Sequence, residues 1–175
     1  VGFTNYAAMV ASPTIRESAL NTLFYWLVPL VPLMAISFGA ALAVASTLIR
    51  WSGFYKPLLY LPQVMAPAAA GLVWTVVLSD EGVLNTLTGA DIRWLSDPAF
   101  TKWAVSLLII WRGVGWYFIV FLAGLTSIPT ELLEAAKVDG ANGWQRVWKI
   151  IVPLMRPIFL FAIVIDTVMA LQLFT

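Results

Sequence analysis

The stretch SALNTLFYWLVPLVPLMAISFGAALAVASTLI, residues 18–49, contains no charged side chain. Residues 57–79 and 113–130 are also free of charge. Each of the last two is close to the length of about 20 apolar residues that a membrane-spanning helix needs, and the first exceeds it. The sequence therefore indicates a polytopic membrane protein.

Composition supports this class. Hydrophobic residues make up 61% of the chain and charged residues 11%, whereas charged residues are roughly 25% of an ordinary soluble domain. The net charge of +1 does not suggest a nucleic-acid partner. The sequence has no His and no Cys, which excludes disulfides, thiolate chemistry, imidazole bases and most transition-metal sites.

We predict an all-α fold, a membrane helical bundle in which residues 1–175 form part of one transmembrane domain. The expected membrane helices cover about residues 19–48, 57–78, 102–125 and 157–175. The first contains Pro29 and Pro32 and the second Pro62 and Pro67, and these prolines are expected to bend the helices. A broken helix is tolerated in a membrane where neighbouring helices or a wet cavity satisfy its backbone, so the prolines suggest a transport path or simply bent structural helices.

The distribution of charge between the helices predicts their direction. The loop at about 49–56 has two basic residues and no acid, and the loop at about 126–156 has four basic residues beside its acids. The loop at about 79–101 is acidic. By the positive-inside rule, the first two loops face the cytoplasm and the third, with the amino terminus, faces outside. Trp94 and Trp103 fit an aromatic belt at the outer interface.

Residues 127–153, here called the coupling loop, form a polar island between two apolar segments. Pro129 suits the first turn of a helix over residues 130–139, and Gly140 suits its end. Asn142 with Gln145 predicts a capping box that starts a second helix, which we expect to end before Pro153. Two short helices turned against each other would make a stiff body continuous with the flanking membrane helices.

The coupling loop resembles a motif of type I ABC importer permeases, the binding-protein-dependent inner-membrane components. Their pattern is Glu-Ala-Ala, three residues, Gly, nine residues, Ile, any residue, Leu-Pro. Here it reads Glu134-Ala135-Ala136, then Gly140, and Ile150 to Pro153, with Val152 in place of Leu. The alternative reading of this loop is an interfacial helix pair without a partner.

Further segments look like the maltose-type carbohydrate branch of that family. They are Gly2 to Tyr6, Leu20 to Leu23, Tyr60 to Pro62 with Pro67, Gly71 and Trp74, Gly82 with Asn85, Trp111 to Gly113, Phe121 to Leu125, and Ala170 to Phe174. The match begins after the family's first core helix and stops before its last. We therefore expect the chain to be an internal portion of a longer permease.

The resemblance implies a function and its partners. The chain would pass a sugar, a disaccharide or similar polyol, from an extracytoplasmic sugar-binding protein to the cytoplasm by alternating access, with a second homologous or identical permease subunit. Two cytoplasmic ATPase subunits would dock on the coupling loop and hold the ATP and magnesium, so this chain needs no cofactor and catalyses nothing. The expected location is the cytoplasmic membrane of a bacterium or archaeon, in contact with lipid.

The expected ATPase-coupling residues are Glu134, Ala135, Ala136, Asp139 and Gly140. The small flank of the two alanines would let a partner approach, and the two acids would orient it.

The resemblance to the carbohydrate branch implies that the sugar is contacted near the middle of the membrane by the helices on either side of the coupling loop, and this gives the expected substrate path. Its residues are Arg112, Gly113, Trp116, Ile165, Asp166, Met169 and Gln172. Three of these, Ile165, Met169 and Gln172, share one helical face at offsets of four and seven. Packing or helix–helix contact is the alternative role for Trp116 and Gln172.

Arg112 and Asp166 are ionisable residues inside membrane helices, where each costs at least about 2.5–3.5 kcal/mol and usually has a partner. Their depths match in antiparallel neighbours, so we expect a direct or water-bridged ion pair that lines the path. The alternative is that Arg112 extends outward and Asp166 pairs with a residue beyond this chain. Other functions left open are a permease for a non-sugar solute, a membrane enzyme using Asp166 with Arg112, and a structural membrane protein.

Overall fold

The computed structural model describes residues 11–46 and 52–172, together with Phe3 and Tyr6. Within these ranges the secondary structure is helical and contains no strand, which confirms the predicted all-α class. The elements are α2 (Pro13–Ala45), α3 (Ser52–Val64), α4 (Pro67–Val77), α5 (Val83–Thr88), α6 (Pro98–Thr126), α7 (Thr130–Val138), α8 (Gly143–Arg146), the π-helical turn η1 (Val147–Ile151), α9 (Val152–Leu154) and α10 (Arg156–Leu171).

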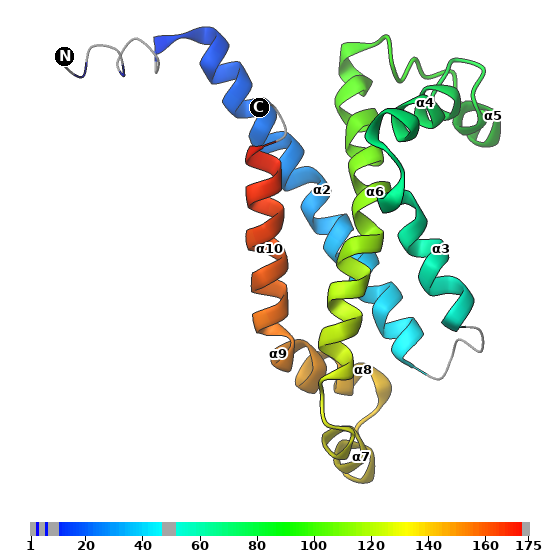
Figure 1. The fold of residues 1–175 in the computed structure, drawn as a ribbon, viewed down its shortest axis with the longest axis vertical. Helices are drawn as coiled ribbons and strands as arrows, with labels where there is room; N and C mark the ends of the chain where they lie inside the picture. Colours follow the sequence, from blue (N-terminus) through cyan, green and yellow to red (C-terminus); the bar gives the residue numbers. More distant parts are fainter. Residues whose placement is uncertain (1–2, 4–5, 7–10, 47–51, 173–175) are drawn as a thin grey trace.

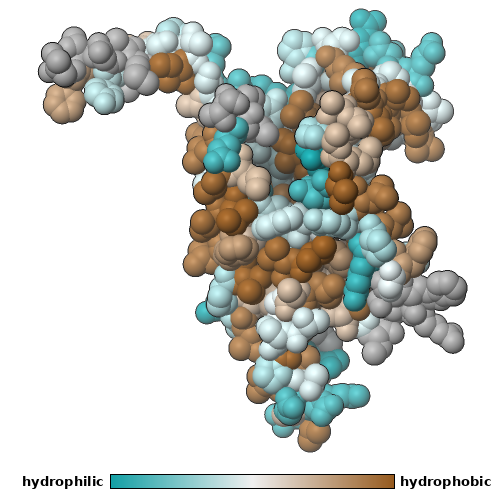
Figure 2. All heavy atoms as spheres, in the orientation of Figure 1, coloured by the Kyte–Doolittle hydropathy of each residue, from teal (hydrophilic) through white to brown (hydrophobic). Residues whose placement is uncertain are grey.

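Two of the described helices, α2 with 33 residues and α6 with 29, are each long and apolar enough to cross a membrane. Two bent pairs pass the same test together: α3 with α4, and the α8–α9 segment with α10. Counting each bent pair as one span gives four in the described part of the chain, so four membrane helices stay a prediction. Apolar side chains cover the middle of the molecule, and hydrophilic ones gather at its two ends (Figure 2).

The structure divides the second predicted helix, residues 57–78, at Pro67, one of the two prolines expected to bend it, whereas the other, Pro62, lies inside α3. The chain bends by 100° between α3 and α4, and Pro67 is the first residue of the new helix. Proline has no N–H to donate, so it fits the first turn of a helix without losing a bond. By contrast, Pro29 and Pro32 lie inside α2, which continues through them.

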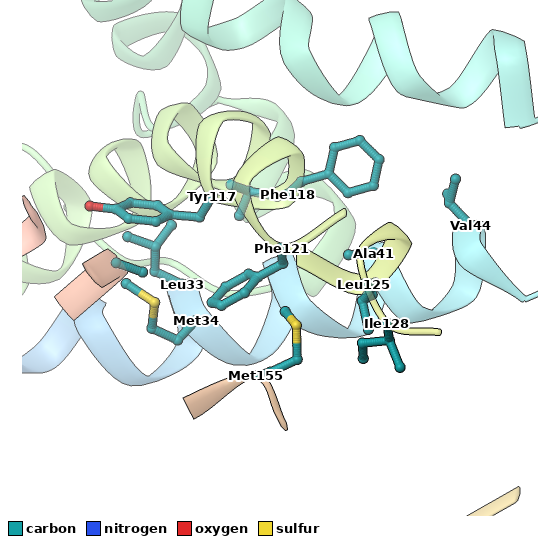
Figure 3. Packing of buried hydrophobic residues seen from close by; sticks show 12 residues of the cluster. Leu33, Met34, Ala41, Val44, Tyr117, Phe118, Phe121, Leu125, Ile128 and Met155 are labelled. Carbon is teal, nitrogen blue, oxygen red and sulfur yellow. The ribbon is translucent and has the colours of Figure 1, made fainter. Parts of the chain in front are cut away.

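The core forms where α2, α6 and α10 meet (Figure 1). Phe118 and Phe121 of α6 are fully buried. The ring of Phe121 lies 5.5 Å from that of Phe38 on α2 and 4.7 Å from that of Phe159 on α10. Met155, just before α10, packs against the same cluster (Figure 3). Three helices distant in sequence are therefore joined by one cluster of three aromatic rings.

Small residues bring the helix backbones close together. A Cβ atom built on Gly115 of α6 would lie 2.8 Å from Cα of Tyr60 and would also collide with the carbonyl oxygen of Leu59, both on α3. Ser37 of α2 is fully buried and donates its hydroxyl to the backbone carbonyl of Val114, at 3.2 Å. Small side chains at such contacts are typical of membrane helices, because they allow close packing.

The loop between α4 and α6 is organised around Asn85 of α5, which is 5% exposed. Its amide nitrogen donates to the carbonyls of Asp80, at 3.0 Å, and Ile92, at 2.8 Å. Its amide oxygen accepts the indole N–H of Trp94, at 2.8 Å. One buried side chain therefore ties together three points of this loop, which lies at the end of the molecule opposite the coupling loop (Figure 1).

Candidate functional site

The first half of the coupling loop is α7, which ends in a glycine-dependent cap. Gly140 has a φ of 79°, in the left-handed region that glycine adopts without steric cost. The N–H of Ala141 donates to the carbonyl of Ala136 at 2.9 Å, and the N–H of Gly140 donates to that of Lys137 at 3.2 Å. This pair of bonds is a Schellman motif, which satisfies carbonyls at the end of a helix. The sharp turn after α7 thus depends on Gly140.

The second half of the coupling loop begins with the predicted capping box. Asn142 accepts the backbone N–H of Gln145 at 2.8 Å, and the Gln145 side chain accepts the N–H of Asn142 at 3.0 Å. The prediction that this helix ends before Pro153 is wrong, because helix continues to Leu154 and bends by 64° into α10. The wider π turn η1 precedes Pro153. In a regular α-helix the ring of Pro153 would collide with the carbonyl four residues earlier, and the wider turn avoids this.

The predicted coupling residues do not all face outward. Glu134, Ala135 and Asp139 are exposed, whereas Ala136 is buried at 8% exposure. Ala136 therefore packs within the chain, and the expectation that both alanines receive a partner is wrong for it. Of the two alanines, Ala135 presents the small exposed flank.

Large apolar side chains of the coupling loop are exposed, and sequence reasoning missed them. Val138 is 88% exposed and Trp144 is 72% exposed. Trp148 is also exposed, and its ring lies 5.4 Å from that of Trp144. The sequence feature that could have revealed them is the presence of large apolar residues inside a polar segment. Exposed aromatic residues of this kind are enriched at protein interfaces.

A cavity of about 560 Å³ lies among α2, α3, α6 and α10. Of the seven predicted path residues, Arg112, Gly113, Trp116, Ile165, Asp166 and Met169 line it. Gln172 is not among its lining residues and instead caps the end of α10. The structure thus brings six predicted residues from two distant segments to one cavity, whereas Gln172, which was expected to share a helical face with Ile165 and Met169, does not line it.

Three polar residues in the cavity wall were not predicted from the sequence: Tyr25 of α2, Gln63 of α3 and Tyr117 of α6. Gln63 comes close to the break between α3 and α4, so its position depends on a bend that composition does not reveal. Together with Trp116, these side chains give the cavity apolar faces and a few hydrogen-bonding groups. A polyol needs both.

Asp166 is paired with Tyr117 and not with Arg112. The Tyr117 hydroxyl donates to Oδ1 of Asp166 at 2.9 Å. Within the described residues Arg112 makes no hydrogen bond through Nε, which is buried, and no ion pair joins it to Asp166 within 4.0 Å. The predicted direct ion pair is therefore wrong, while a water-bridged one stays a prediction. The rotation of α6 about its axis accounts for this. It places the hydroxyl of Tyr117, at a similar depth, within hydrogen-bond distance of Asp166.

A larger cavity, of about 850 Å³, lies where the end of α2 meets α6 and the coupling loop. Most of its lining is apolar, and Arg146 is its one charged residue among those described. The smaller cavity has more hydrogen-bonding side chains in its lining, including the bonded pair Tyr117 and Asp166, and is therefore the better candidate for a solute site.

Comparison with known proteins identifies the chain. The family model described as "Binding-protein-dependent transport system inner membrane component" matches residues 35–175. The chain is 35% identical to the sn-glycerol-3-phosphate transport system permease protein UgpA of Agrobacterium fabrum, over 97% of the chain and 59% of that protein. It is 28% identical to the lactose transport system permease protein LacF of Rhizobium radiobacter, over 99% of the chain and 60% of that protein. The chain thus spans about three fifths of the length of these relatives.

Solved structures share the fold. A bacterial alginate ABC transporter in complex with an alginate pentasaccharide-bound periplasmic protein contains a similar chain, with a TM-score of 0.81 and 27% identity over 95% of this chain and 60% of that one. A second structure of a bacterial ABC transporter, involved in the import of the acidic polysaccharide alginate, has a TM-score of 0.83. With its apolar helices, the chain is a multi-pass protein of the inner membrane. It belongs to the family of binding-protein-dependent transport system inner membrane components.

Proposed function

We propose that the chain is the permease subunit of an ATP-driven importer that passes a sugar, a disaccharide or similar polyol, into the bacterial cytoplasm by alternating access. The family description and the transport systems named for its relatives, lactose among them, support this proposal. Those relatives are permeases, which is consistent with a subunit that catalyses no reaction and argues against an enzyme built on Asp166.

The observation that carries the proposal is the position of the cavity. Its walls come largely from α6 and α10, and these two helices flank the coupling loop at one end of the molecule (Figure 1). Movement of the coupling loop would therefore pass into both cavity walls. The packing of Gly124 against Met155 joins α6 to the start of α10, so the two helices are in contact just above the loop.

The partners follow from the two ends. Two ATPase subunits, with their ATP and magnesium, would receive the coupling loops of this permease and of a second, homologous or identical one. Glu134 and Asp139 would supply charge at that contact, and Val138 with Trp144 would supply apolar area. At the other end, the loop ordered by Asn85 would meet an extracytoplasmic sugar-binding protein, as the charge distribution between the helices predicts.

The test is solute uptake by the full-length permease, reconstituted in proteoliposomes with its second permease, ATPase and binding-protein partners. We expect ATP-dependent uptake of at least one member of a panel of labelled disaccharides, which includes neutral ones such as lactose and maltose and an acidic one, cellobiouronic acid. Glu134→Lys should abolish uptake while the protein remains in the membrane, because it puts a cation where the partner meets an anion. Glu131→Lys, the same change on the same exposed helix, is the matched control and should retain most of the uptake.

Uptake of sn-glycerol 3-phosphate in the same assay tests the non-sugar alternative, which the relatives named UgpA favour. If that solute is taken up and no sugar is, the proposed cargo is a polyol phosphate and not a sugar. Normal uptake by Glu134→Lys would contradict the proposal that α7 couples the permease to the ATPase.

A further inference from the structure

Arg112 lies halfway along α6 and lines the 560 Å³ cavity. Its Nε is shielded from solvent and has no hydrogen-bond partner among the described residues. A guanidinium stays charged at any physiological pH and offers five N–H donors in a planar fork. A buried donor without a partner is costly, and an unpaired cation inside a membrane more so. The cavity therefore contains a cation that lacks a counter-charge.

The acidic residue in the cavity lining, Asp166, does not supply the counter-charge of Arg112. Asp166 is the one acidic residue among the lining residues that the structure describes, and its Oδ1 already accepts the hydroxyl of Tyr117. No ion pair within 4.0 Å links it to Arg112. Asp166 on α10 and Arg112 on α6 thus present separate polar positions on two cavity walls: an acceptor that is partly used, and a guanidinium whose shielded Nε has no partner among the described residues.

We propose that the transported solute is a polyol that carries an acidic group, a carboxylate or a phosphate, and that Arg112 binds this group. The inference rests on the proposed import function and specifies its cargo. An oxyanion with two oxygens matches the fork of a guanidinium in a bidentate, charge-assisted pair. The ring of Trp116 supplies an apolar face for the polyol carbons, and Gln63 supplies groups for its hydroxyls.

A neutral polyol fits the same cavity less well. Its hydroxyls would satisfy the donors of Arg112 but would leave the positive charge uncompensated in a medium of low dielectric constant. Removing one partner of a desolvated, hydrogen-bonded charge pair weakens binding by about 30-fold or more. Arg112 should therefore select the acidic member of any pair of otherwise identical solutes.

The experiment measures the access of a reagent to Arg112 in the assembled full-length transporter in lipid nanodiscs. Phenylglyoxal modifies arginine side chains, and peptide mass spectrometry reports the rate at Arg112. Cellobiose is compared with cellobiouronic acid for the carboxylate, and glycerol with sn-glycerol 3-phosphate for the phosphate. We expect at least one acidic probe to slow modification about 10-fold or more, and its neutral counterpart to slow it less than about 2-fold. Arg16, which is exposed and is not among the residues that line the cavity, should react equally with every probe.

Two substitutions separate charge from packing. Arg112→Gln should reduce the preference for the acidic probe over the neutral one about 10-fold or more, measured by tryptophan fluorescence titration. Arg112→Lys keeps the charge and should retain part of the preference. Arg16→Gln should behave as the unmodified protein.

Equal protection by acidic and neutral probes, or no protection by either acidic probe, would overturn the inference. If labelled neutral sugars are nevertheless taken up with ATP, import stands and the acidic cargo alone falls. If no probe protects Arg112 and none is taken up, both the import function and its acidic cargo fall. An acid of a partner subunit bound to Arg112 would show as a guanidinium that does not react with or without probes, and this result also contradicts the proposal.

Discussion

Gly115→Ala should destabilise the permease because the added methyl group meets backbone. The new Cβ would lie 2.8 Å from Cα of Tyr60, whereas non-bonded carbon atoms prefer about 3.5–4.0 Å. The Leu59 carbonyl oxygen is also too close. Neither atom can rotate away, so α3 would have to move from α6 by about 1 Å. Overpacking of this kind costs about 1–3 kcal/mol.

Gly39→Ala on α2 is the matched control, because a Cβ there has no heavy atom within 4 Å. It should leave stability unchanged or raise it by up to about 1 kcal/mol through helix propensity. The assay measures the midpoint of thermal unfolding of the full-length permease in detergent. A fluorescent fusion is heated, and size-exclusion chromatography reports the fraction that remains folded. We expect Gly115→Ala to lower the midpoint by roughly 2–12 °C. Equal midpoints for the two variants would refute the claim that α3 and α6 touch through backbone.

Three further outcomes are expected. Gly140→Ala forces a left-handed φ on a residue with a Cβ and should cost about 1–2 kcal/mol in the same thermal assay, whereas Gly143→Ala, without a positive φ, should not; equal midpoints would argue against the strained cap. A double-mutant cycle of Tyr117→Phe and Asp166→Asn should show a coupling of about 0.6 kcal/mol, and at most about 1.7; strict additivity would contradict the hydrogen bond. Ser96→Cys should react with an impermeant thiol reagent in intact cells with a permeabilised outer barrier, and labelling only after lysis would reverse the predicted topology.

The helices could be predicted from the sequence because hydrophobicity acts locally. The predicted helices 19–48 and 102–125 correspond to α2 and α6, which begin earlier, at Pro13 and Pro98. Residues 47 and 48 of the first prediction lie outside the described residues. The break at Pro67 could not be separated from the continuous course at Pro29 and Pro32, since all three residues have the same local chemistry. Whether a proline breaks a helix depends on which neighbours satisfy the freed backbone.

The cavity residues could be predicted in part because helical periodicity fixes which side chains share a face. Ile165 and Met169 reach the cavity in this way, although Gln172 of the same predicted face does not, and Asp166 was predicted from its charge inside a membrane helix. The partner of Asp166 could not be predicted, because depth alone does not determine how two helices are rotated about their axes. Ala136 illustrates the same limit on the coupling loop, where a motif of small residues does not reveal which of them faces inward.

The three bonds of Asn85 have a consequence for how any protein would associate with that end of the molecule. Flexible loops lose conformational freedom when they bind, at about 0.5–1.5 kcal/mol for each immobilised side chain. Here Asp80, Ile92 and Trp94 are held by one buried amide before any encounter. Association should then resemble the docking of two rigid surfaces, with a rate set by collision and orientation. Asn85→Ala would turn that encounter into coupled folding and binding, slowing it without removing a single contact residue from the surface.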